Sequence, residues 1–196
     1  MANESTRRTL IKCMKKLVRE HSFSQISIDS ICELAHISRR TFYRYFPDKY
    51  SLLETTYLEG FFNKLDTSDV ANFWDLFRKL CEQIYSEQSF FSHAFDVKGQ
   101  NGFWEEATKI IAPYMRRDFP VTDDIREMVE FYISNDIDVL FQLIERWIKD
   151  GYNMTPEQFS ARTHDSFKVH GKWIYEVATG RPLTGYTQQK LDNHEW

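Results

Sequence analysis

The segment SIDSICELAHISRRTFYRYFPDK, residues 27–49, contains two short amphipathic stretches joined by two residues. Ser27 and Ser38 open these stretches, and a serine hydroxyl can accept a hydrogen bond from the free N–H groups in the first turn of a helix. The residues between them, His36 and Ile37, are too few for a long loop. Two short helices at this spacing are typical of a helix-turn-helix, whose second helix enters the major groove of DNA.

The start of the second helix carries side chains that can read bases. Arg39 or Arg40 can donate two hydrogen bonds to guanine O6 and N7, a contact that provides about 1–3 kcal/mol of discrimination. Thr41 can contact a thymine methyl group or a phosphate, and Arg44 can reach either a base or a phosphate. Hydroxyl groups and a lysine complete the expected DNA-binding set, which is Ser27, Ser38, Arg39, Arg40, Thr41, Tyr43, Arg44, Tyr45 and Lys49.

The charge of the chain is divided unevenly around this segment. Residues 1–52 hold ten Lys and Arg against five Asp and Glu, a balance of +5, although the whole chain has a net charge of −4. The remaining residues hold 15 basic and 24 acidic side chains, a balance of −9. This asymmetry favours a polyanion-binding N-terminal part and a second part that does not bind nucleic acid.

The whole chain has the pattern of an all-α protein. It contains only seven glycines and five prolines, and apolar residues recur three and four positions apart over long windows. We predict a three-helix DNA-binding domain at residues 1–52 and a larger helical domain at 53–196. The expected helices are 5–21, 27–35, one from 38 to Pro47, 48–65, 70–88, 89–98, 102–117, 124–150 and 156–179, with a junction at Pro120 and a loose tail over the last 17 residues.

Residues 28–49 closely resemble the DNA-binding signature of the TetR/AcrR family. The match is carried by the helix-turn-helix followed by Tyr43-Arg44-Tyr45-Phe46 and, three residues later, by Lys49. The resemblance implies a dimer that binds a palindromic operator and is controlled by a small molecule, and we expect a repressor. The family usually has glycine where this chain has His36, and histidine tolerates a positive φ angle better than a β-branched residue does.

The second domain is rich in aromatic residues, most of which we expect in its core. An effector pocket within residues 60–145 is a hypothesis that the sequence does not localise to particular side chains. Residues 131–152 are apolar on nearly every face, so a partner subunit is one way to bury them. Their C-terminal part resembles DhaS-type regulators, which implies a two-fold four-helix interface with the 156–179 helix and recognition helices about 34–36 Å apart.

Other classes of protein fit the sequence less well. The six histidines form no HExxH motif, no Gly-rich phosphate loop is present, and Cys13, Cys32 and Cys81 lie in apolar helical patterns. We therefore expect no enzyme activity, metal site, cofactor or disulfide. No stretch is apolar enough for a membrane span or secretory signal, so a cytoplasmic location is expected. The alternative is a coactivator or adaptor on the same scaffold that binds a protein partner with little or no DNA binding.

Overall fold

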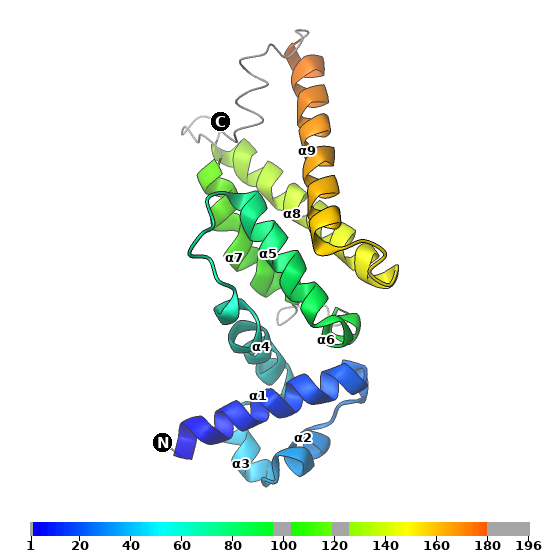
Figure 1. Ribbon diagram of the computed structural model, residues 1–196. Helices are drawn as coiled ribbons and strands as arrows, with labels where there is room; N and C mark the ends of the chain where they lie inside the picture. The colour runs from blue at the N-terminus through cyan, green and yellow to red at the C-terminus, as the bar shows by residue number, and fades with distance from the viewer. Residues whose placement is uncertain (1, 96–102, 119–125, 180–196) are drawn as a thin grey trace. The chain divides into compact units, whose positions relative to one another are not determined.

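The computed structural model describes residues 2–95, 103–118 and 126–179 (Figure 1). Within these ranges every regular element is helical, which confirms the predicted all-α class. The α-helices are α1 (Ala2–Glu20), α2 (Ile28–Ala35), α3 (Arg39–Tyr43), α4 (Lys49–Gly60), α5 (Phe73–Ser86), α6 (Gln88–Ala94), α7 (Phe103–Asp118), α8 (Arg126–Lys149) and α9 (Pro156–Thr179), with 3₁₀ turns η1 (Phe23–Gln25) and η2 (Phe62–Lys64). The predicted junction at Pro120 and the tail from Gly180 lie outside the described residues.

Several predicted helices are shorter than expected, among them the two that flank Pro47. The helix predicted from residue 38 to Pro47 ends at Tyr43, because the N–H groups of Arg44 and Tyr45 donate to carbonyls three residues back instead of four. The sequence also predicted a helix from residue 48 to 65, whereas α4 ends at Gly60 and η2 follows. Phe61 leaves the helical region of backbone conformation, with φ −127° and ψ −66°. Both Phe61 and Phe62 are buried, so the chain breaks the helix where two consecutive aromatic side chains enter the core.

The chain divides into two compact units, which are described separately. The first comprises Met1–Asp66 and Ser86–Lys109, and the second comprises Thr67–Tyr85 and Ile110–Trp196. The functional boundary predicted after Leu52 falls inside α4, within the first unit. As a division between DNA binding and regulation, that boundary stays a prediction.

In the first unit, α1 contacts α2, α4 and α6, and α2 contacts α3 (Figure 1). The face of α1 that carries Leu10, Met14 and Val18 is fully buried, as its apolar spacing predicted. On α3, Phe42 is also fully buried, and its ring centroid lies 6.2 Å from that of Phe46. Contacts of this kind hold α2 against α1 and α3 against α2, because helices of five and eight residues are not stable alone.

A charged cluster joins α1 to the start of α6 in the same unit. Glu87 accepts hydrogen bonds from Lys15 Nζ, at 2.5 Å, and from Arg19 Nη2. Burial raises the pKa of Glu87, but the hydrogen bonds and charges of these two cations outweigh it, so the pKa lies below its ordinary value. Lys15 also lies over the ring of Phe61, at 4.3 Å from the ring centroid.

The second unit is built from α5, α8, α9 and the end of α7. Trp147 of α8 is 2% exposed and stacks on Phe159 of α9, with ring centroids 4.5 Å apart. Its indole N–H donates to the carbonyl of Met154 at 3.0 Å, which fixes the turn between α8 and α9. Trp74 of α5 lies against His164 of α9 at 4.6 Å, so α9 also packs along α5.

Candidate nucleic-acid interface

Serine hydroxyl groups cap α2 and α3, as the sequence predicted. Ser27 Oγ accepts from the backbone N–H of Ser30 at 3.0 Å, and Ser30 Oγ accepts from the N–H of Ser27 at 3.1 Å. Ser38 Oγ accepts from the N–H of Thr41 at 3.1 Å and lies 3.0 Å from its hydroxyl. The two caps satisfy donors that a helix start leaves open, and therefore set where each short helix begins.

His36 makes the turn between the two helices. Its φ of 54° and ψ of 43° lie in the left-handed region, and its N–H reaches the carbonyls of Cys32 and Glu33. This is the backbone conformation for which glycine is usual after a helix. The expectation that histidine adopts a positive φ here is confirmed.

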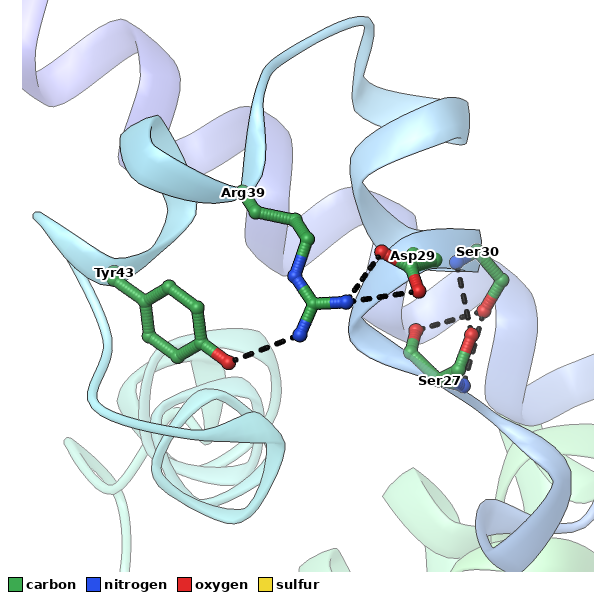
Figure 2. Close-up of polar contacts among 5 residues, drawn as sticks. All are labelled: Ser27, Asp29, Ser30, Arg39 and Tyr43. Atoms are coloured by element: carbon green, nitrogen blue, oxygen red, sulfur yellow. Dashed lines mark hydrogen bonds and ion pairs between the residues drawn. The ribbon is translucent and has the colours of Figure 1, made fainter.

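Arg39 is held at the surface by two partners from different helices (Figure 2). Its Nη1 lies 3.0 Å from both carboxylate oxygens of Asp29, in the first turn of α2. Its Nη2 lies 3.5 Å from the hydroxyl of Tyr43, one turn further along α3. The Tyr43 hydrogen bond and the Asp29 charge raise the pKa of Arg39 above its ordinary value. Arg39 and Tyr43 belong to the DNA-binding set predicted from the sequence, whereas Asp29 does not.

The other predicted residues of α3 and its end have different surroundings. Arg40 is exposed and makes no hydrogen bond or ion pair with the described part of the chain, so its guanidinium can move. The guanidinium of Arg44 lies 5.3 Å from the ring centroid of Tyr45. A hydrogen bond from Thr6 of α1, followed by the influence of Arg44, lowers the pKa of Tyr45. Tyr45 therefore lies between α1 and the surface, whereas Tyr43 is 48% exposed.

Lys49, the first residue of α4, is bound to the backbone that precedes α2. Its Nζ donates to the carbonyl oxygens of Phe23 at 3.0 Å and Ile26 at 2.7 Å. The ammonium also lies 4.5 Å from the ring centroid of Phe23, and partial burial lowers the pKa of Lys49. The side chain thus fixes the 3₁₀ turn η1 and the entry to Ser27, a role that the sequence did not reveal.

Three of the predicted DNA-binding residues meet in one open groove of about 490 Å³, which lies in the first unit. Ser27, Arg39 and Lys49 line it. The other lining residues are Ser24, Ile26, Ile28, Asp29, Asp48 and Tyr50. The N-terminal ends of α2 and α4 both border this groove, and backbone N–H groups at helix starts favour anions such as phosphate.

The described residues contain neither a metal-binding cluster nor a membrane-spanning helix. Among these residues, no group of three or more His, Cys, Asp and Glu could hold a metal ion. No helix in the same ranges is long and apolar enough to cross a membrane. All three cysteines are buried, and burial raises the pKa of each thiol.

Comparison with known proteins agrees with this geometry. Residues 14–56 match the family model described as bacterial regulatory proteins, tetR family, and residues 72–168 match that of a transcriptional regulator C-terminal region. The chain belongs to the TetR family. As a member of this family it is a DNA-binding transcription regulator with an N-terminal helix-turn-helix.

A curated DhaS protein and a solved DhaS structure are both similar to this TetR-family chain. The HTH-type dhaKLM operon transcriptional activator DhaS of Lactococcus lactis subsp. lactis is 31% identical over 107 residues, which are 49% of this chain and 57% of that protein. The match thus spans little more than half of that relative's length. A solved structure, dihydroxyacetone kinase operon activator DhaS, has a TM-score of 0.57 and 18% identity over 84% of this chain and 95% of its own. At that identity the likeness shows the fold alone.

Proposed function

We propose that this protein regulates transcription by binding a palindromic operator as a homodimer under the control of a small-molecule effector. The observation that supports the operator most directly is a pair of exposed arginines, Arg39 and Arg40, at the start of α3, which Ser38 caps. Residues at that end of a recognition helix reach base edges in the major groove. Acting on a chromosomal operator would keep the protein in the cytoplasm.

The remaining predicted residues suit contacts to the DNA backbone around α3. Tyr43 and Arg44 are exposed, and Thr41 lies beside them at the start of the same helix. Ser27 and Lys49 border the groove between the starts of α2 and α4. Contacts of this kind position a protein on the duplex, and each neutralised phosphate makes the affinity more dependent on salt.

An exposed apolar stripe on α8 supports a homodimer. Phe131 is 67% exposed and Tyr132 and Val139 are each 45% exposed, whereas the opposite face of α8 is buried. Phe131 and Val139 are eight residues apart and therefore share one side of the helix. On α9, Val169 is 69% exposed. A second copy that covers these side chains would form the two-fold helical interface predicted from the sequence.

The direction of regulation and the effector form the second part of the proposal. The sequence led us to expect a repressor, whereas the DhaS relative is named as an activator. A reporter gene placed behind the selected operator distinguishes the two, because expression falls with a repressor and rises with an activator. Titration of the DNA complex with small molecules would identify the effector by the shift in affinity.

The first experiment is a selection of operators from random DNA duplexes with the purified chain at low and moderate salt. Enrichment of a palindrome whose half-sites lie about one helical turn apart would support a dimeric regulator. A protein that enriches no sequence at either salt would instead act as an adaptor for a protein partner. Analytical ultracentrifugation of the same preparation tests the dimer independently of DNA.

A further inference from the structure

We propose that Asp29 determines the specificity of DNA binding by holding Arg39 in the orientation that reads a guanine. This inference rests on the proposed operator binding and assigns a role to an acidic residue on a surface that must approach phosphates. Asp29 lies on α2, and Arg39 follows it by ten residues, so the two are not neighbours in the sequence. The turn at His36 brings the two together.

The geometry leaves one edge of the Arg39 guanidinium available. Asp29 engages Nη1 alone, with both carboxylate oxygens at 3.0 Å, and the Tyr43 hydroxyl lies 3.5 Å from Nη2 (Figure 2). Nε forms no hydrogen bond with the described residues. At 3.5 Å the Tyr43 contact is at the limit of a hydrogen bond, so a base can displace it, and the edge formed by Nε and Nη2 can then donate in parallel to guanine O6 and N7 while Asp29 keeps Nη1.

Holding the arginine matters because the side chain is otherwise mobile. The side chains of Arg39 and Asp29 are 58% and 67% exposed, and an exposed ion pair contributes little to folding stability in water. In a DNA complex water is excluded and the same pair becomes stronger. An arginine that is already oriented loses less conformational freedom when it binds a base.

The carboxylate also prevents a competing contact. Without Asp29, the Arg39 guanidinium could swing to a phosphate, and phosphates are present on every sequence. With Asp29, that movement would leave a carboxylate unpaired beside the DNA backbone, where like charges repel. Asp29 therefore weakens binding to incorrect sequences more than binding to a site that offers guanine.

The expected effect of Asp29→Ala has two parts. The preference for guanine at the base pair read by Arg39 should fall by about threefold or more, as for contacting residues that are coupled. Affinity for an unrelated duplex should rise, and the slope of log K against log salt should steepen by about 0.9 if Arg39 gains a phosphate contact. Asp29→Asn keeps one acceptor for Nη1 and should show a smaller loss of preference.

The test uses the selected operator and a set of duplexes in which each base pair is replaced in turn. Dissociation constants are measured for the wild type, Asp29→Ala, Arg39→Ala and the double variant. Glu33→Ala is the matched control, because Glu33 is an exposed acid on the same helix and contacts no described arginine. Circular dichroism confirms that each variant is folded.

The proposal is supported if Asp29→Ala and Arg39→Ala lose preference at the same base pair, the double variant loses no more than Arg39→Ala, and Glu33→Ala retains the preference. It is overturned if Asp29→Ala keeps the wild-type preference at the position that depends on Arg39, or if Arg39→Ala changes no base preference. A wild-type protein that selects no operator overturns the proposed function as well. The two failures are thereby distinguished.

Discussion

The contacts of Lys49 lead to a prediction about both folding and DNA binding. Lys49→Met removes the ammonium group but keeps an apolar stem that can cover the ring of Phe23. The carbonyl oxygens of Phe23 and Ile26 then lose donors that lie 3.0 and 2.7 Å away. Removing such an interaction costs about 1.5–3 kcal/mol for a charged donor in a buried setting. Lys49 is only half-buried and its ammonium is partly desolvated, so we expect a loss of about 1–2 kcal/mol in total.

The stability assay is urea unfolding followed by circular dichroism. Lys12→Met is the matched control, because Lys12 is exposed on α1 and forms no hydrogen bond or ion pair with the described residues. Lys49→Met should lower the free energy of unfolding, and Lys12→Met should leave it unchanged within about 0.5 kcal/mol. Equal unfolding midpoints for Lys49→Met and the wild type would refute the reasoning that this side chain fixes the entry to α2.

The same variant tests the contact with DNA that the sequence predicted. Two of the three N–H groups of the Lys49 ammonium are used by backbone carbonyls, which leaves one for a phosphate. We therefore expect Lys49→Met to bind all sequences more weakly and to reduce the slope of log K against log salt by about 0.9. A less stable protein with an unchanged slope would show that Lys49 supports the fold without touching the DNA backbone.

Three further predictions concern other parts of the chain. Burial alone would raise the pKa of Glu87, but its two cationic partners lower the pKa by more than that, so the carboxylate stabilises the fold above pH 4.5. Glu87→Gln should lower the free energy of unfolding in urea by about 1 kcal/mol at pH 7, and the difference from the wild type should shrink as the pH falls below 4.5. Phe131→Glu should weaken the dimer more than about tenfold in analytical ultracentrifugation, and an unchanged dissociation constant would place the interface elsewhere. His36→Gly should raise the free energy of unfolding by about 0.5–1 kcal/mol, because glycine relieves the positive φ, and a lower urea midpoint would contradict this.

Most of the helices could be predicted because their local signals agree with their packing. The serine caps of α2 and α3 and the proline that starts α9 each mark a helix end in the sequence. The exception is the end of α4, where Gly60 is a poor helix former but gives only a weak stop signal, because its φ is not positive and apolar residues continue after it. Burial of Phe61 and Phe62 in the core accompanies the break, and tertiary packing of this kind is not visible in the local sequence.

The long helix α8 shows a second limit of periodicity. The sequence indicated apolar residues on nearly every face, and the structure divides them into two sets. Ile133, Ile137 and Ile144 are buried, whereas Phe131 and Val139 are exposed in the single chain. Periodicity identifies which residues are apolar, but it cannot say which of them the same chain covers and which are left for a partner.

Asp29 and Lys49 show why one missed contact could have been anticipated and the other could not. An acidic residue in the first turn of a helix is favoured by the helix dipole, so Asp29 already has a sufficient local explanation and gives no sign of a distant partner. A lysine at the first position of α4 is disfavoured by the same dipole. Such a conflict between a residue and its local setting indicates an interaction elsewhere, and for Lys49 that interaction is with the carbonyls of Phe23 and Ile26. A search of a helix-turn-helix sequence for charged residues that the helix dipole disfavours at their positions would find a residue such as Lys49. A residue like Asp29 is found only when the turn at His36 has set the two helices against each other.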